Sequence, residues 1–145
     1  MNGMSDAVGG RQFHARGEDA MLALGAELSA ELAGGQVWSL SGDLGAGKTT
    51  LVRGMLRGLG FGGRVKSPSY GLVESYDLGP LTVHHLDLYR LSDPGELDFI
   101  GLEDLFDDNS VLLVEWPERA GGRLPPATVQ LGIVLDGDAR RILID

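Results

Sequence analysis

The chain contains no cysteine, only two lysines and no long hydrophobic run. Without cysteine, disulfide bonds, thiolate metal sites and cysteine nucleophiles are all excluded. No apolar stretch approaches the roughly 20 residues that a membrane-spanning helix needs, and the N-terminus lacks the basic start and apolar run of a signal peptide. We therefore expect a cytoplasmic protein that does not associate with membranes.

The length and charge of the chain limit its organisation and its partners. Its 145 residues, of which 43% are hydrophobic, suffice for one buried core but not for two ordinary domains. We expect residues 1–10, rich in glycine and polar side chains, to be disordered and residues 11–145 to form one domain. The 12 basic and 21 acidic side chains give a formal net charge of -9, which would repel a phosphate backbone. Direct binding to nucleic acid is therefore not expected.

Hydrophobic periodicity predicts both helices and strands. Apolar residues at helical spacing predict helices over residues 19–33 and 48–59, and a helical patch over residues 94–106. Short apolar or alternating runs predict strands, at residues 36–41, 72–76, 81–86, 111–114, 129–135 and 141–144. Short turns between two of these strand pairs predict antiparallel hairpins, whereas the continuous apolar run at 111–114 is typical of a strand covered on both faces.

Residues 42–49 match the phosphate-binding loop G-x-x-x-x-G-K-[ST], here called the P-loop, between a predicted strand and a predicted helix. Glycines allow several backbone N–H groups to turn toward phosphate oxygens, and the following helix adds the positive end of its dipole. Lys48 is expected to reach the β and γ phosphates, and the Thr49 hydroxyl to bind magnesium. The predicted nucleotide-binding residues are Gly42, Asp43, Leu44, Gly45, Ala46, Gly47, Lys48, Thr49 and Thr50.

The two lysines also bear on the choice of nucleotide. Guanine-selective P-loop proteins generally use an Asn-Lys-x-Asp element, and neither Lys48 nor Lys66 is preceded by Asn. We therefore expect ATP rather than GTP. No feature of the sequence identifies the adenine pocket.

Acidic residues that follow predicted strands are candidates for holding magnesium from the protein side. Glu115 follows the apolar run at 111–114, and Asp87 follows the predicted strand at 81–86. Trp116 comes next, at the carboxyl end of its strand, where open α/β sheets bind ligands. The alternatives are a backbone cap for either acid and a core position for the tryptophan.

The segment of residues 65–70 follows the P-loop helix, where several P-loop switches place a nucleotide-sensing loop. Ser67 or Ser69 could offer a hydroxyl to magnesium or to the attacking water, and an ordinary turn is the alternative. Arg90 is either a charge stabiliser or a salt-bridge partner. We interpret the three histidines, which show no metal-ligand spacing, as structural or surface residues: His14, His84 and His85.

Four motifs occur in one order at compact spacing: Gly42-Asp43-Leu44-Gly45-Ala46-Gly47-Lys48-Thr49-Thr50-Leu51, Val65-Lys66-Ser67-Pro68-Ser69-Tyr70, His85-Leu86-Asp87-Leu88-Tyr89-Arg90-Leu91 and Glu115-Trp116-Pro117. Together they resemble the bacterial TsaE (YjeE) family, the ATPase of tRNA threonylcarbamoyladenosine biosynthesis. The resemblance implies an α/β fold, a single P-loop NTPase-like domain with a mixed parallel and antiparallel sheet flanked by helices. It further implies a magnesium-dependent ATPase that acts with the threonylcarbamoyl transferase subunits TsaB and TsaD and meets tRNA only indirectly.

The resemblance also implies roles for individual residues. Lys48 corresponds to the phosphate-binding lysine, and Thr49 and Glu115 to the magnesium ligands. Asp87 and Trp116 correspond to residues that are needed for activity. Ser69 stands where the family usually has Thr, so it keeps the hydroxyl but loses the methyl group that would fix its rotamer.

Three functions are compatible with these features. In a partner-dependent ATPase, Asp87 or a group near Ser69 would orient the attacking water. A small-molecule kinase would need a mobile lid, for which only the stretch around Arg119 and Arg123 offers room. In a non-catalytic module, ATP would order the loop at 67–70 for a partner. The four motifs together favour the ATPase.

Overall fold

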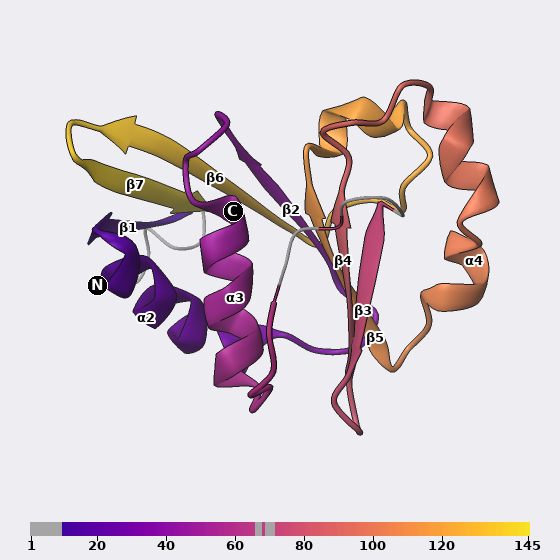
Figure 1. Cartoon of the computed structure of the whole chain (residues 1–145), viewed down its shortest axis with the longest axis horizontal. Helices are drawn as coiled ribbons and strands as arrows, with labels where there is room; N and C mark the ends of the chain where they lie inside the picture. Colours follow the sequence, from indigo (N-terminus) through magenta and orange to yellow (C-terminus); the bar gives the residue numbers. More distant parts are fainter. Residues whose placement is uncertain (1–9, 66–67, 69–71) are drawn as a thin grey trace.

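The computed structural model describes residues 10–65, 68 and 72–145. Residues 1–9, for which the sequence predicts disorder, lie outside the described residues, and so do Lys66, Ser67 and Ser69. The elements follow in chain order: β1 (Arg11–Arg16), α2 (Glu18–Leu28), η1 (Ser29–Glu31), β2 (Val37–Gly42), α3 (Lys48–Gly58), β3 (Val73–Asp77), β4 (Thr82–Asp87), η2 (Pro94–Phe99), α4 (Leu102–Leu105), β5 (Ser110–Glu115), η3 (Pro117–Ala120), β6 (Val129–Asp136) and β7 (Ala139–Ile144) (Figure 1).

The described strands form a seven-stranded sheet in the order β1-β7-β6-β2-β5-β4-β3. Its centre is parallel, because β2 runs parallel to both β5 and β6, and β5 runs parallel to β4. Antiparallel pairs lie toward both edges, where β7 joins β1 and β6 and where β3 joins β4. The predicted α/β fold with a mixed sheet is confirmed.

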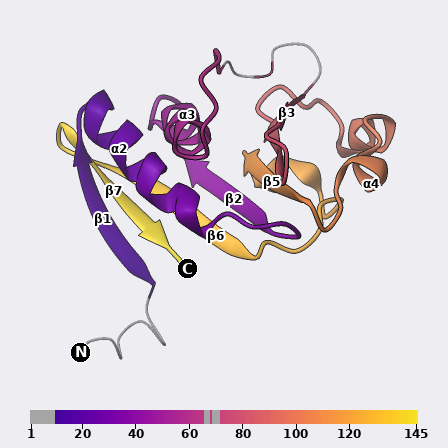
Figure 2. The ribbon, with the colours of Figure 1, turned by 90° about the horizontal axis from the view of Figure 1, so that it is seen from below.

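Alternate side chains of the strands enter two separate cores. Helices α2 and α3 cover one face of the sheet (Figure 2), where Trp38 and Leu113 are fully buried. On the opposite face, Leu112 and Val114 pack with residues of η2 and η3 in a smaller core. β5 is buried over its whole length, as the continuous apolar run predicts.

Two predicted helical segments are shorter in the structure. The helix predicted over residues 19–33 ends at Leu28, where the Ser29 hydroxyl donates to the Ala26 carbonyl and the chain tightens into the 3-10 turn η1. The patch at 94–106 is divided at Gly101, whose φ of 69° ends one short turn before the next begins. None of the described helices is long and apolar enough to cross a membrane.

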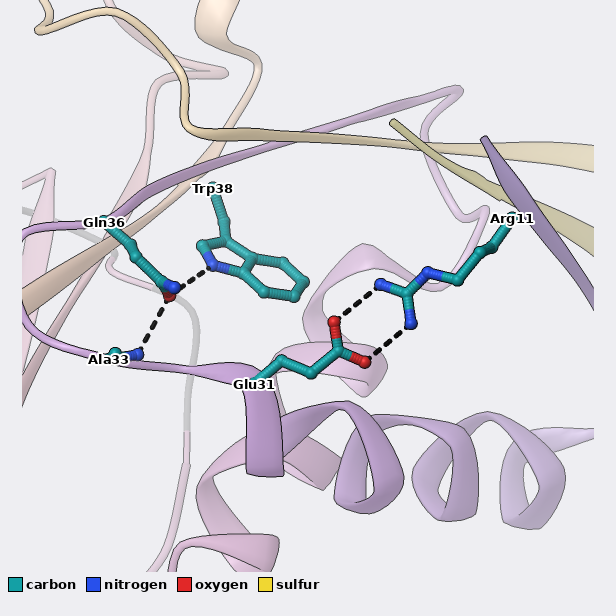
Figure 3. Close-up of polar contacts among 5 residues, drawn as sticks. All are labelled: Arg11, Glu31, Ala33, Gln36 and Trp38. Carbon is teal, nitrogen blue, oxygen red and sulfur yellow. Dashed lines mark hydrogen bonds and ion pairs between the residues drawn. The ribbon is translucent and has the colours of Figure 1, made fainter. Parts of the chain in front are cut away.

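The edge strand β1 has no counterpart among the predicted strands. Ala15 is buried and Phe13 is partly buried, so the apolar alternation is too short to be distinctive. Pairing with β7 and a two-pronged ion pair hold the strand in place: the Arg11 guanidinium donates to both Glu31 oxygens at 2.7 and 2.6 Å (Figure 3). These bonds lower the pKa of Glu31. Tertiary contacts therefore define β1.

The loop that leads into β2 is fixed by one side chain. The Gln36 Oε1 accepts hydrogen bonds from the Ala33 backbone N–H and the Trp38 indole N–H, each at 2.9 Å (Figure 3). Since Trp38 is fully buried, its N–H needs such a partner. The bonds set where β2 begins, and β2 carries the P-loop at its other end.

Helices α2 and α3 cross so closely that their backbones touch at two glycines. A Cβ atom on Gly54 would lie 2.4 Å from the Leu22 carbonyl oxygen, and one on Gly25 would lie 2.5 Å from the Leu51 oxygen. These separations are far below van der Waals contact. Because α3 begins at Lys48, this crossing also positions the P-loop.

We expect Gly54→Ala to lower the free energy of unfolding by ~1–3 kcal/mol, as overpacking of a filled core does. This loss should exceed the gain in helix propensity from Gly to Ala. Urea unfolding of the two proteins measures the difference. Gly62→Ala is the matched control, because a Cβ on Gly62 meets no atom within 4 Å. A Gly54→Ala protein as stable as the original would contradict the tight crossing.

Candidate functional site

Three strands and one helix meet at a single pocket. β2 ends at Gly42 and leads into the P-loop, and α3 begins at Lys48. β4 and β5 end at Asp87 and Glu115, which are partners in the parallel register and so lie side by side. The ends enclose a pocket of about 540 Å3, lined by Leu44, Gly45, Gly47, Lys48, Thr49, Thr50, Pro68, Leu72, Asp87, Tyr89, Arg90, Glu115 and Trp116.

The P-loop has the strand–loop–helix context that its sequence predicts. Gly45 and Gly47 have φ values of 80° and 110°, in the left-handed region that residues with a Cβ rarely adopt. Gly47 precedes the first helical residue, and its carbonyl accepts the Leu51 N–H of the first turn of α3. Successive N–H groups at such a turn and helix start form an anion-binding concavity.

Lys48 is buried at the base of the pocket. Its Nζ donates to the carbonyls of Gly42 and Asp43, at 3.0 Å for Asp43, and lies 4.2 Å from the centre of the Trp116 ring. Burial lowers the pKa of Lys48, an effect that the carboxylates of Glu115 and Asp87 oppose. The ammonium group is thus held by carbonyl dipoles, an aromatic face and nearby negative charge.

Thr49 and Glu115 are in direct contact. The Thr49 hydroxyl donates to the Glu115 Oε2 at 2.8 Å, and the His85 Nε2 lies 2.7 Å from the same oxygen. Glu115 and His85 are both buried, and they come from neighbouring strands. The interpretation of the histidines as structural or surface residues omitted this contact. His14, by contrast, is exposed, and His84 bonds Ser75 and the Leu105 carbonyl.

Asp87 lies beside Glu115 at the pocket wall. Burial raises the pKa of its carboxyl group, and the neighbouring Glu115 raises it further. Its Oδ1 accepts the backbone N–H of Tyr89 at 3.1 Å. Asp87 therefore caps a turn, the alternative left open above, and at the same time faces the pocket.

Trp116 turns the chain sharply at the end of β5. Its φ of 58° is left-handed, which is unusual for a large side chain and is a form of strain found at functional sites. The indole packs against the Tyr89 ring, with centroids 5.2 Å apart, and the Arg119 guanidinium lies 5.4 Å from the Tyr89 ring centre. The turn thus places an aromatic pair on the wall of the pocket rather than in the core.

The remaining predicted residues fall into three groups. Gly42, Asp43 and Ala46 shape the P-loop through their backbone, and Ser69 lies outside the described residues. Arg90 lines the pocket, whereas Arg123 forms an ion pair with Asp98 at 3.5 Å. Tyr89 and Leu44 were not singled out for catalysis and also line the pocket; Tyr89 lies within the motif that contains Asp87.

A smaller pocket of about 230 Å3 lies on the other side of the P-loop. It shares Gly45, Gly47 and Thr50 with the larger pocket, and its remaining walls come from distant parts of the chain: Gly17, Glu18, Met21, Ala46, Asp138 and Arg140. The Arg140 Nε donates to the Ala46 carbonyl at 3.1 Å. The turn between β6 and β7 is thereby attached to the P-loop.

A parallel strand, a glycine loop and a helix, with two acidic strand ends beside them, define a P-loop α/β protein. The family model for "Threonylcarbamoyl adenosine biosynthesis protein TsaE" matches residues 15–143. The chain therefore belongs to the TsaE family, as the four motifs indicate.

Individual relatives agree with this family. The chain is 53% identical over 103 residues to the tRNA threonylcarbamoyladenosine biosynthesis protein TsaE of Haemophilus influenzae, and 40% identical over 107 residues to that of Bacillus subtilis. The matches cover 71% and 74% of this chain, and 65% and 66% of the relatives, slightly less than two thirds of their length. The crystal structure of Bacillus subtilis YdiB is similar with a TM-score of 0.74 and 31% identity, over 93% of this chain and 85% of that one.

Proposed function

We propose that this chain is a magnesium-dependent ATPase that supports threonylcarbamoyladenosine formation in tRNA by acting with the transferase subunits TsaB and TsaD. The observation that carries the ATPase is the convergence of Lys48 and Thr49 with two acidic strand ends on one pocket. The family to which the chain belongs supports the pathway. The slow step and the partners come from the resemblance of the motifs.

The P-loop fits a triphosphate. Its glycines leave the backbone N–H groups accessible, and Lys48 supplies a buried positive charge at the same point. During hydrolysis, water oxygen bonds to the γ phosphorus while the bond to the bridging oxygen breaks, which yields ADP and phosphate. Lys48 and the N–H groups stabilise the charge that develops on the transferred group.

The donor set beside the loop also fits magnesium, because a hydroxyl and carboxylates are the oxygen ligands that this ion prefers. Thr49 and Glu115 would hold it, and their direct contact places both oxygen groups together. Bound magnesium would neutralise phosphate charge and fix the geometry of the triphosphate. Asp87, one register position away from this pair, is assigned to orient the attacking water.

The smaller pocket is the best candidate for the nucleoside. It begins at Gly45 and Thr50, where the triphosphate would leave the P-loop, and it is enclosed by Glu18 and Arg140. We propose that the base and ribose enter between the start of α2 and the β6–β7 turn. The absence of an Asn-Lys-x-Asp element in the sequence favours adenine over guanine.

The test is ATP turnover by the purified chain, alone and with the TsaB–TsaD pair. We expect slow release of phosphate alone and a rise of roughly tenfold or more with the pair, since one added transition-state contact worth about 1.4 kcal/mol gives that factor. The pair without the chain is the blank. An unchanged rate would count against partner gating, and a phosphorylated metabolite in place of free phosphate would indicate a kinase.

A further inference from the structure

His85 is a buried, polar side chain to which the mechanism above gives no role. Its side chain is fully buried, and it belongs to the face of β4 that packs under the P-loop helix. Its Nε2 lies 2.7 Å from Glu115 Oε2. Among the described residues, nothing hydrogen-bonds its other ring nitrogen, Nδ1, although that atom is also buried.

This arrangement is unfavourable for a residue that only fills the core. A leucine at the same place would bury apolar surface without leaving a polar atom unsatisfied. An ionised carboxylate accepts hydrogen bonds only, so the bond to Glu115 requires the proton on Nε2 and leaves Nδ1 as the unpaired atom. The cost is incurred at a single contact, the one with Glu115.

Both known contacts of this carboxylate end on the same oxygen. Thr49 donates to Oε2 at 2.8 Å from the helix side, and His85 donates to it from the strand side. The two bonds together fix the plane of the Glu115 side chain. When Thr49 turns its oxygen toward a metal ion, the bond from His85 still restrains the carboxylate.

We propose that His85 is a positioning residue, which holds the Glu115 carboxylate in its orientation toward Thr49 and thereby sets the affinity of the site for magnesium. The inference rests on the proposed function, because it assumes that Glu115 is a magnesium ligand. Hydrogen-bond partners of metal ligands elsewhere change metal affinity by about 10- to 100-fold when they are replaced. His85 acts through Glu115 and does not touch the nucleotide.

Binding of the non-hydrolysable ATP analogue AMP-PNP to the full chain, measured by calorimetry over a series of magnesium concentrations and in EDTA, tests this role. We expect His85→Leu to require about 10- to 100-fold more magnesium for half-maximal enhancement of binding. Affinity in EDTA should stay unchanged. His85→Gln, whose amide N–H has nearly the reach of Nε2, should restore the requirement to within a few-fold of the original.

Two further variants separate positioning from folding. His84→Leu removes the neighbouring buried histidine, which bonds Ser75 and Leu105 on the opposite side of β4, and should lower stability without changing the magnesium requirement. His85→Asn carries the same amide as Gln but one methylene shorter, so it should resemble His85→Leu. If the leucine variant does not fold, the comparison of Gln with Asn decides.

The outcomes distinguish the two levels of the proposal. Equal magnesium requirements in the Gln and Asn variants, or a loss of affinity that is as large in EDTA as with magnesium, would overturn the role of His85. If binding of AMP-PNP to the original protein shows no dependence on magnesium, the proposed function itself fails. A shifted requirement in His85→Leu with rescue by Gln supports both.

Discussion

Replacing Lys48 with Ala should reduce ATP turnover by at least 100- to 1000-fold, the range seen when one preorganised donor to a developing charge is removed. The ammonium group is buried between two loop carbonyls, the Trp116 ring and nearby carboxylates. Water cannot replace it there without loss of that fixed geometry. Phosphate release under saturating ATP measures the effect.

The fold should survive this substitution. Burial lowers the pKa of Lys48, so the charged form carries a desolvation cost that the Ala variant no longer has. We therefore expect the melting temperature to stay within a few degrees of the original. Arg57→Ala is the matched control, because Arg57 is an exposed cation in the last turn of the same helix. Hydrolysis by Lys48→Ala at a rate close to that of the control would exclude the P-loop as the catalytic site.

Features that depend on contiguous residues could be predicted from the sequence. The P-loop is one example, because eight adjacent residues specify the turn, the phosphate contacts and the helix start. β5 is another, since an apolar run without alternation requires cover on both faces, and two cores provide it. The placement of Asp87 and Glu115 at strand ends follows from the same local patterns.

Features that depend on strand order could not be predicted in this way. His85 and Glu115 are 30 residues apart, and they meet only because β4 and β5 are parallel neighbours in a particular register. A one-residue shift of β4 would turn His85 to the opposite face. The smaller pocket has the same origin, as Glu18 and Arg140 come together through the pairing of β1 and β7.

Trp116 shows how local and tertiary terms compete. Its type and position predict either core burial or a ligand contact, and sequence alone leaves both open. The left-handed backbone at this residue decides the matter, because it turns the indole out of the line of β5 toward Lys48 and Tyr89. No propensity scale favours that conformation for tryptophan, so only the surrounding contacts can stabilise it.

Replacing Asp87 with Asn should lower turnover by about 100- to 10,000-fold, the contribution of a positioned acid–base group, while it raises stability at neutral pH. Burial and the charge of Glu115 raise the pKa of Asp87, so the folded protein holds this proton more tightly than the unfolded chain does. Its contribution to stability is favourable at low pH and is lost as the pH rises through the folded-state pKa. The neutral amide does not titrate, so the melting temperature of the variant should exceed that of the original by a few degrees at pH 7, and the gap should close as the solution is acidified.

Asp77→Asn gives a matched control for the capping role of Asp87. Asp77 ends the neighbouring strand β3, and its Oδ1 accepts the N–H of Gly79 at 3.0 Å, just as Asp87 accepts that of Tyr89 two residues on. It is exposed and lies outside the residues that line the pocket. If Asp87 served only as a cap, the two variants would lose similar stability and keep similar turnover. Loss of turnover confined to Asp87→Asn, together with a pH-dependent gain in melting temperature, would show that the carboxylate is kept at this position for chemistry at a cost in stability.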